Sequence, residues 1–489
     1  MADVPIIAGF YPDPSICRAG DDYYVANSSF EYAPGVPIWH STDLRQWNQV
    51  GNALEGPSRL PPGANLASSG IYAPTLRHHD GRFWLVTTDI AEIQRGHLIV
   101  SAENAAGPWS EPVYTQGTIG IDPDLCWDEH GVCHLTWASF DPNMSGIATA
   151  PIDPTTGEML SEPLLLWAGS GLAAPEGPHL YRIHDWWYLL LAEGGTERGH
   201  AVTVARSRAL DGDWEPAPSN PILSHRSLST PVQNTGHADL VESPEGAWAM
   251  VYLGVRPRGK TPGFHTNGRE TFLAGVDWVD GWPVVIEDRF EAAKVDRSFT
   301  DKFPEGPLHP RWISPGGSPE RLLSRKGNRL RITPVDGDQA PAILACRVTD
   351  FDWTSEVALN SATGNARFAV RIDESHWYGL TTFADRIDAT LRIGPATTTV
   401  AQVPRNPHEP VTLRLRARTG QGRLFQPADE ADLVTMSIIG PNGVEQVLGE
   451  FDGRYVSTEV ASGFTGRVLA LEARDGSVVV DSFSYTVTA

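Results

Sequence analysis

A turn followed by an aromatic-rich strand recurs along the first part of this chain, and this repeat limits the folds that the chain can adopt. The starts of the copies lie roughly 50–60 residues apart, a spacing typical of propeller blades that each contain four strands. No sustained helical periodicity interrupts the pattern. The repeat therefore predicts a five-bladed β-propeller, to which we assign residues 1–295. The copies lie at residues 20–25, 80–86, 129–135, 185–190 and 244–252.

A polar corner recurs with the strands, and tryptophan closes it in three of four copies. These tryptophans are Trp47, Trp109 and Trp214. A large aromatic side chain at a repeated corner is most simply part of the packing within a blade. We therefore expect the three indole rings to be structural.

The pattern changes after the repeat, and from Arg321 the chain reads as short alternating strands separated by turn residues. Residues 353–359 and 411–416 are clear examples. This pattern is typical of a β-sandwich or jelly roll. A length of 489 residues is also too great for one ordinary hydrophobic core. We predict an all-β protein in which residues 296–489 form a jelly-roll-like C-terminal β-sandwich.

Charge and composition exclude several classes of partner. A formal net charge of −22 argues against binding to nucleic acid. No apolar run is long enough to span a membrane, and the start of the chain lacks the basic and apolar regions of a leader. We expect a cytoplasmic protein, or a secreted one if a leader was removed; the sequence leaves a homo-oligomer open. The four cysteines lack metal-type spacing and are expected to be reduced.

Unusual polar residues precede the repeating strands, often beside proline. Their successive gaps are roughly 59, 50, 54 and 61 residues, which matches the repeat. Because the first strand of each blade ends at the central channel, we expect these side chains to share one pocket. The residues are Asp13, Tyr72, Asp122, Glu176 and His237.

Asp13 lies between Pro12 and Pro14. The two rings fix the neighbouring φ angles, and Pro14 is expected to push Asp13 into the extended region. A simple turn is the alternative interpretation, because Asp and Pro are common in turns. Three carboxylates that each lie next to proline at a matching spacing favour a functional role.

Two carboxylates in one pocket suit glycoside hydrolysis. An inverting enzyme holds a basic and an acidic carboxyl group about 6.5–9.5 Å apart, with a water between them. Asp13, held firmly, suits the ionised base. Glu176 suits the acid if a neighbouring charge, that of Asp122, raises its pKa. Strand alternation puts Asp124 on the same face as Asp122, so the choice between these two rests on the motif.

These motifs resemble those of glycoside hydrolase family 43, the five-bladed propeller hydrolases of arabinose- and xylose-containing glycans. The resemblance covers the whole predicted propeller, and residues 457–466 are similar to the C-terminal sandwich of the β-xylosidase and α-L-arabinofuranosidase branch. The matching pieces of the propeller are residues 11–15, 28–32, 34–38, 72–75, 121–123, 175–178, 236–241 and 268–272.

The resemblance implies a role for each residue of the pocket. It implies that Asp13 is the general base, Asp122 the pKa modulator and Glu176 the general acid, with inversion at the anomeric carbon. It also implies that Arg269 contacts sugar hydroxyls and that His237 lies under the channel. Further substrate contacts are implied for Phe30, Tyr72 and, from the sandwich, Phe464.

Several alternatives stay open. Several xylosidases that resemble this chain look to have a tryptophan at the position of Tyr72. This difference leaves arabinofuranosidase activity open. Glu270 is interpreted as an ion-pair partner of Arg269. Some family members hold Ca²⁺ in the channel, where His237 would be a ligand. One histidine without convergent carboxylates is poor Ca²⁺ chemistry, so we expect no required cofactor.

We therefore expect an exo-acting glycosidase that releases terminal β-D-xylose or α-L-arabinofuranose from xylo- or arabino-oligosaccharides. An endo-arabinanase and a non-catalytic carbohydrate-binding propeller are the rival interpretations. The sequence does not decide between the two pentoses, because the shape of the pocket depends on loops between the motifs.

Overall fold

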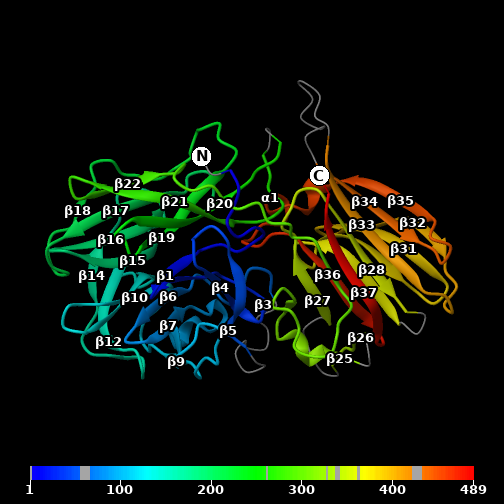
Figure 1. Ribbon diagram of the computed structural model, residues 1–489, viewed down its shortest axis with the longest axis horizontal. Helices are drawn as coiled ribbons and strands as arrows, with labels where there is room; N and C mark the ends of the chain where they lie inside the picture. Colours follow the sequence, from blue (N-terminus) through cyan, green and yellow to red (C-terminus); the bar gives the residue numbers. More distant parts are fainter. Residues whose placement is uncertain are drawn as a thin grey trace.

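The protein is built almost wholly from β-strands, as its computed structural model shows. The propeller strands, coloured blue to green in Figure 1, lie on one side of the molecule, and the sandwich strands, coloured yellow to red, on the other. This arrangement confirms the predicted fold class. The structure describes residues 3–55, 66–259, 263–325, 329–335, 342–360, 364–420 and 432–488.

The first half of the chain forms antiparallel sheets whose strands follow one another in chain order. The described residues give five such sheets. The first sheet contains β1 (Ser15–Ala19), β2 (Asp22–Ala26), β4 (Gly35–Ser41) and β5 (Asn48–Leu54). The second contains β6 (Thr75–His79), β7 (Arg82–Thr87), β8 (Leu98–Ala102) and β9 (Val113–Tyr114). The third contains β10 (Gly120–Trp127), β11 (Cys133–Ser139), β12 (Gly146–Asp153), β13 (Glu158–Met159) and β14 (Leu164–Trp167).

The remaining two sheets complete the propeller. The fourth contains β15 (Glu176–Ile183), β16 (Trp186–Glu193), β17 (Ala201–Ser207) and β18 (Glu215–Pro216). The fifth contains β19 (Gln233–Glu242), β20 (Trp248–Val255), β21 (Glu270–Val279) and β22 (Trp282–Ile286). The first strands of the sheets contact one another in the cyclic order β1, β6, β10, β15, β19 and back to β1. The starts of these strands therefore meet around one axis.

The predicted repeat coincides with the hairpin between the first and second strands of each sheet. Four of these hairpins contain a glycine at positive φ, and the fourth in chain order has His184 at φ 53° instead. A two-residue hairpin needs such angles to match the twist of its strands. Trp47 and Trp109 are buried in propeller core clusters, and Trp214 packs partly buried against another.

The second half folds into two packed sheets. The strands of the first sheet are β23 (Phe299–Asp301), β25 (Leu323–Arg325), β26 (Leu330–Ile332), β28 (Trp353–Leu359), β33 (Val411–Thr419), β34 (Asp432–Ile439), β35 (Glu445–Asp452) and β37 (Val478–Val487). Those of the second are β27 (Ile343–Arg347), β29 (Asn365–Arg371), β30 (His376–Thr382), β31 (Arg386–Ile393), β32 (Ala396–Pro404) and β36 (Val468–Asp475).

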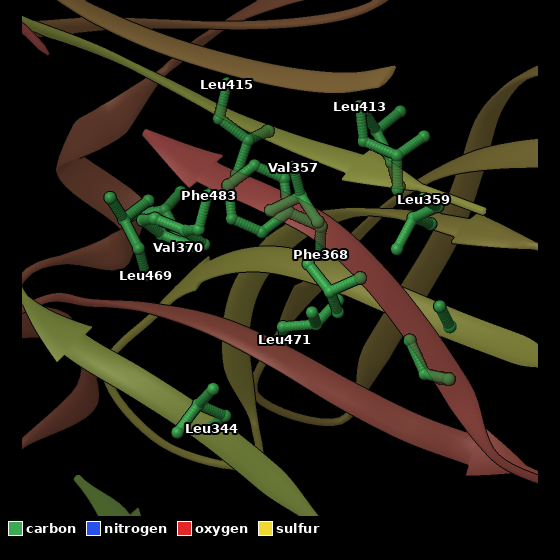
Figure 2. Packing of buried hydrophobic residues seen from close by; sticks show 14 of the residues in the cluster. Leu344, Val357, Leu359, Phe368, Val370, Leu413, Leu415, Leu469, Leu471 and Phe483 are labelled. Carbon is green, nitrogen blue, oxygen red and sulfur yellow. The ribbon is translucent and has the colours of Figure 1, made fainter. Parts of the chain in front are cut away.

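Apolar side chains fill the space between the two sheets of the sandwich. Burial alternates strictly along β28, as expected for a strand with one face in a core. Figure 2 shows Val357 and Leu413 from the first sheet beside Phe368 and Leu471 from the second. This core is separate from those of the propeller.

Short elements connect the two halves. The strand β3 (Tyr32–Ala33) pairs with β24 (Ser314–Pro315), which lies beyond the propeller in the sequence. The helical segments are η1 (Ile90–Arg95), η2 (Pro319–Leu322), η4 (Gly453–Val456) and α1 (Thr458–Ala461). None of the helices in the described part of the chain is long and apolar enough to cross a membrane. The domain boundary at residues 295 and 296 stays a prediction.

Candidate active site

A three-residue motif repeats where the first strands begin. Its first residue has a positive φ, its second is proline or alanine, and its third is polar and buried. A β-bulge accompanies it in β10, β15 and β19, and bulges redirect side chains beside functional sites. The first residues, which we call the pocket layer, are Asp13 (φ 52°), Asp122 (φ 55°), Gly177 (φ 55°) and His237 (φ 46°). The third residues are Ser15, Asp124, His179 and Asp239.

The predicted extended conformation of Asp13 is wrong, because its φ of 52° lies in the left-handed region. Aspartate tolerates this region better than most residues. The surrounding hydrogen bonds hold it there: the Asn27 side-chain amide donates to the carbonyl oxygens of Tyr11 and Pro12, at 2.9 and 3.1 Å. Backbone strain of this kind gathers at functional sites, so the clamped aspartate is more than a surface turn.

The Asp13 carboxylate is buried and accepts hydrogen bonds from two side chains. Arg269 Nη1 donates to Oδ1 at 3.0 Å, and Ser28 Oγ donates to Oδ2 at 2.6 Å. His237 Nδ1 lies 3.6 Å from Oδ1. Burial alone would raise the pKa of Asp13, but Arg269, His237 and Ser28 outweigh it and lower this pKa. The carboxylate is therefore ionised at neutral pH and able to accept a proton.

Glu176 has the opposite protonation. It begins β15, and burial, followed by the charge of Asp13, raises its pKa to about 7. Asp122 accepts a hydrogen bond from the Gly177 backbone N–H at 3.1 Å, beside Glu176. Burial and the charges of Glu176 and Asp13 raise the pKa of Asp122 as well. Three carboxyl groups thus lie near one guanidinium, that of Arg269. The three carboxyl groups together therefore retain protons near neutral pH.

Three aromatic rings from distant parts of the chain form one wall. The ring of Phe30 lies 5.7 Å from that of Tyr72 and 5.8 Å from that of Phe464. The guanidinium of Arg269 lies 5.3 Å from the centroid of Phe464. Ser68 Oγ accepts a hydrogen bond from the Phe464 backbone N–H at 2.8 Å, which fixes the sandwich residue against the propeller. Six of the eight side chains singled out from the sequence are therefore joined by contacts, and Asp122 and Glu176 adjoin them at Gly177, whose N–H donates to Asp122.

Gly177 allows His237 to approach this cluster. A Cβ atom built on Gly177 would lie 2.9 Å from His237 Nε2, so a larger residue would displace the ring. Burial lowers the pKa of His237 to about 4, and the imidazole is therefore neutral at neutral pH. Sequence reasoning did not assign Ser28 or Gly177 a role, although both lie within motifs that it singled out.

Below the pocket layer lies a second set of buried polar groups around Arg77. We call it the Arg77 layer; it contains Arg77 and the third residues of the motif, Ser15, Asp124, His179 and Asp239. Arg77 Nη2 donates to Asp124 at 2.6 Å, and Nη1 donates to Asp239 at 2.7 Å. Ser15 Oγ donates to Asp239 at 2.7 Å, and His179 Nδ1 lies 3.2 Å from Asp124.

Asp122 accepts from the Gly177 N–H and Asp124 accepts from the Leu180 N–H, so both carboxylates face β15 but at different depths along it. The bulge inserts an extra residue between Ile121 and Asp124. Asp124 is fully buried and paired with Arg77, whereas Asp122 belongs to the pocket layer. The sequence of a single strand does not show where a bulge interrupts its alternation. Arg77 was not found from the sequence because it belongs to no recognised motif.

The interpretation of Glu270 as the ion-pair partner of Arg269 is wrong. Arg256 Nε donates to Glu270 Oε2 at 2.6 Å, and the Gly9 backbone N–H donates to Oε1 at 2.9 Å. Arg269 directly precedes β21, which begins at Glu270, and the two side chains have different partners: Asp13 for Arg269 and Arg256 for Glu270. Glu270 supports the segment that leads to Asp13.

The described residues contain no group of three or more His, Cys, Asp or Glu side chains that could hold a metal ion. Ca²⁺ requires six to eight oxygen ligands, and the Asp13 carboxylate next to His237 already accepts from Arg269 and Ser28. The donors near His237 therefore do not fit such an ion, and no step below uses one. The four cysteines are free thiols.

A cavity of about 720 Å³ opens beside the cluster. Arg269 and Phe464 belong to its lining, together with Asn234 and Arg198 from the propeller and Glu459 from the sandwich. Glu459 accepts hydrogen bonds from the backbone N–H of His265 at 2.8 Å and lies 2.6 Å from its Nδ1. Both halves of the molecule thus build the approach to the carboxylates.

Two family descriptions match this chain. Residues 2–283 match "Glycosyl hydrolases family 43", and residues 300–486 match "Beta xylosidase C-terminal Concanavalin A-like domain". The chain is 46% identical to a xylosidase/arabinosidase of Butyrivibrio fibrisolvens, in an alignment that spans 58% of this chain and only 56% of that relative. It is 34% identical to a non-reducing end α-L-arabinofuranosidase of Bacteroides ovatus, over 96% of this chain and 90% of that one.

Solved structures agree with these relatives in fold. The Bacteroides ovatus xyloglucan PUL GH43B structure superposes with a TM-score of 0.88 at 32% identity, and the match covers 99% of each chain. A xylan β-1,4-xylosidase from Bacillus halodurans superposes with a TM-score of 0.88 at 28% identity, over 99% of this chain and all of the other. The likeness extends over the propeller and the sandwich alike.

Proposed function

The chain belongs to glycosyl hydrolases family 43 and is a glycoside hydrolase, and we propose that it is an inverting exo-glycosidase that releases terminal β-D-xylose or α-L-arabinofuranose from xylo- or arabino-oligosaccharides. The relatives named xylosidase/arabinosidase, α-L-arabinofuranosidase and β-xylosidase support a terminal pentose as the sugar removed. Because the names divide between two pentoses, both substrates stay within the proposal.

The opposite protonation of Asp13 and Glu176 carries the proposal. Asp13 is held ionised by Arg269 and Ser28, whereas Glu176 keeps its proton up to about pH 7. Inverting hydrolysis needs this combination of a base and an acid. In the proposed reaction Asp13 takes a proton from water, and the water oxygen attacks the anomeric carbon. Glu176 gives its proton to the glycosidic oxygen as that bond breaks.

Other residues of the cluster bind and orient. Asp122 accepts from the Gly177 N–H and thereby fixes the backbone next to Glu176. Arg269 has its Nη1 committed to Asp13, and its Nε has no partner among the described residues. We assign that free donor to a sugar hydroxyl. The rings of Phe30, Tyr72 and Phe464 provide an apolar wall for the C–H face of a pentose.

The test is hydrolysis of nitrophenyl β-D-xyloside and nitrophenyl α-L-arabinofuranoside by the purified chain, with the Glu176→Gln variant as a matched control. We expect release of nitrophenol from at least one pentoside and inverted configuration in the first product seen by NMR. The variant should lose more activity on an unactivated oligosaccharide than on the aryl glycoside, because a good leaving group needs little protonation.

Three results would contradict the proposal. No nitrophenol from either pentoside would favour a non-catalytic carbohydrate-binding propeller. Oligosaccharide products from arabinan without free arabinose would favour an endo-arabinanase. Equal loss by Glu176→Gln on good and poor leaving groups would remove Glu176 from the acid role. The cytoplasmic location stays a prediction, and a homo-oligomer stays open.

A further inference from the structure

A second cavity, of about 290 Å³, lies at the seam between the propeller and the sandwich. It shares no lining residue with the cavity beside Arg269. Propeller residues form one wall, and residues that follow the propeller in the sequence form the other. The two walls differ in chemistry, and this difference restricts what the cavity can bind.

The propeller wall is apolar and aromatic. Trp39 and Trp47 contribute indole rings, and Ile6 and Ile7 lie beside them. The amide side chains of Asn48 and Gln49 complete this side. The Trp39 indole N–H has no hydrogen-bond partner among the described residues. A sugar ring has an apolar C–H face and a polar edge. It therefore binds where a flat aromatic surface lies next to amide groups that form hydrogen bonds with its hydroxyls.

The opposite wall is cationic. It contains Arg297, Arg311 and Arg347. Arg297 is paired with Asp350 at 3.1 Å. Among the residues that the structure describes, neither Arg311 nor Arg347 forms an ion pair with a carboxylate, and the guanidinium of Arg347 lies 4.4 and 4.3 Å from the rings of Phe10 and Tyr11. Buried charges are normally paired, so two unpaired guanidinium groups in a chain of net charge −22 require an explanation.

Arg347 is the more deeply buried of the two and is only 6% exposed. Its Nε donates to the Phe10 carbonyl oxygen at 3.0 Å, and its Nη1 lies 3.5 Å from the Tyr11 hydroxyl. Its Nη2 has no partner among the described residues. The side chain is therefore fixed by the propeller, and its guanidinium belongs to the lining of the cavity.

Arg311 lies across an aromatic ring. Its guanidinium is 4.0 Å from the centroid of Phe299, and its Nε lies 3.0 Å from His309 Nδ1. Burial lowers the pKa of Arg311, and the charges of Cys346 and Asp301 offset this lowering only in part. An anion in the cavity would offset this cost.

We propose that the seam cavity binds a monosaccharide acid of the hexuronate class. The carboxylate would lie against the guanidinium groups of Arg311 and Arg347, since guanidinium groups bind carboxylates with two parallel hydrogen bonds. The ring would lie against Trp39 and Trp47, with hydroxyls toward Asn48 and Gln49. The volume suits one sugar ring and not a longer chain. This inference does not depend on the proposed function.

The first experiment is isothermal titration of the purified full chain with D-glucuronate, D-glucose and inorganic phosphate. We expect one site for glucuronate and at least tenfold weaker binding of the other two. Glucose has the same ring without the carboxylate, and phosphate has the charge without the ring. Binding of glucose as tight as that of glucuronate would overturn the role of the arginines. Equal binding of phosphate would overturn the role of the aromatic wall.

The second experiment locates the site. Arg311→Gln should weaken glucuronate binding at least tenfold, and Trp39→Leu should weaken it severalfold. The matched control is Arg208→Gln, which removes an exposed arginine paired with Asp185 and should leave the affinity unchanged. Arg311→Gln is preferred to a change at Arg347, because Arg347 also supports Phe10. Unchanged affinity in Arg311→Gln would overturn the proposal.

Activity distinguishes this cavity from the active site. Glucuronate should not compete with an aryl pentoside for the active site. The Arg311→Gln variant should hydrolyse the aryl pentoside at the wild-type rate. Competitive inhibition that persists in Arg311→Gln would place the acid beside Arg269 and contradict the inference. If the chain hydrolyses neither pentoside, the proposed function fails while the titration result still stands.

Discussion

The pocket layer and the Arg77 layer are built from the same repeated motif, two residues apart, yet they differ in charge balance. Arg77 pairs with both Asp124 and Asp239. Burial alone would raise the pKa of Asp239, but Arg77 and its other partners outweigh it and lower this pKa. In the pocket layer and at the adjacent Glu176, only Asp13 has a guanidinium partner, and the pKa values of Asp122 and Glu176 are raised.

This difference teaches how one backbone device serves two purposes. A buried carboxylate with a full set of partners stays ionised and holds neighbouring sheets together. A buried carboxyl group that lacks a cation, and faces other carboxylates, keeps a proton near neutral pH and can transfer it. The chemistry of the site therefore arises from an imbalance of charge on a framework whose next layer is balanced.

The largest expected effect is that of Asp13→Asn. We expect kcat to fall about 10³- to 10⁴-fold, because the amide cannot accept a proton from water. The measurement is the steady-state hydrolysis of an aryl pentoside, with folding checked by circular dichroism. Asp124→Asn is the matched change in the Arg77 layer and should reduce stability instead. Equal losses of activity in the two folded variants would break the distinction between the layers.

Next in size is Arg77→Met, which should lower the free energy of unfolding by about 3–5 kcal/mol, because Asp124 and Asp239 would remain buried without a cation. Urea unfolding followed by tryptophan fluorescence measures it. Arg208→Met, which breaks an exposed pair with Asp185, should change stability by less than about 1 kcal/mol. A similarly small cost for Arg77→Met would show that the Arg77 layer is not a structural support.

The pH dependence of kcat/KM should reflect the imbalance in the pocket layer. The acid works when protonated and its pKa is raised to about 7, so activity is present below that pH. It should fall about tenfold per unit above it. The lowered pKa of Asp13 moves the loss on the acidic side below the usual range of aspartate. Glu176→Gln should abolish the alkaline decline; a decline that persists would assign it to another group.

The smallest effect concerns the wall that the sandwich contributes. Phe464→Ala should raise KM about fivefold with little change in kcat, because a half-buried ring loses roughly 1 kcal/mol of apolar contact with the sugar. Val460→Ala, an exposed residue of α1, is the control and should behave as wild type. A large fall in kcat without a change in KM would mean that Phe464 positions the catalytic groups.

Much of this arrangement follows from the sequence, because its signals are local. Turn residues and aromatic strands predicted the hairpins, and the prolines beside Asp13, Asp122 and Glu176 marked the starts of first strands. Phe464 was found through family resemblance alone, since nothing around it indicates that it reaches the propeller. The roles of these residues stay predictions until the variants are measured.

The failures have a common physical cause. The conformation of Asp13 depends on a backbone irregularity that long-range contacts enforce, and a similar irregularity separates Asp124 from the pocket layer. Local rules for prolines and for alternating strands describe regular backbone and cannot show it. Glu270 was assigned to the wrong arginine because the correct partner, Arg256, directly follows β20, which pairs with the strand that Glu270 begins. Pairings across strands become visible only when the register is known.

The hydrogen bond from the Phe464 N–H to Ser68 joins residues 396 positions apart. A ribosome must therefore release nearly all of the propeller and most of the sandwich before the pocket has its full wall. Nascent chains that stop short of Phe464 would lack the ring that packs against Phe30 and Tyr72. Premature termination late in the message would thus leave three intact acidic groups in a pocket that cannot hold its sugar well.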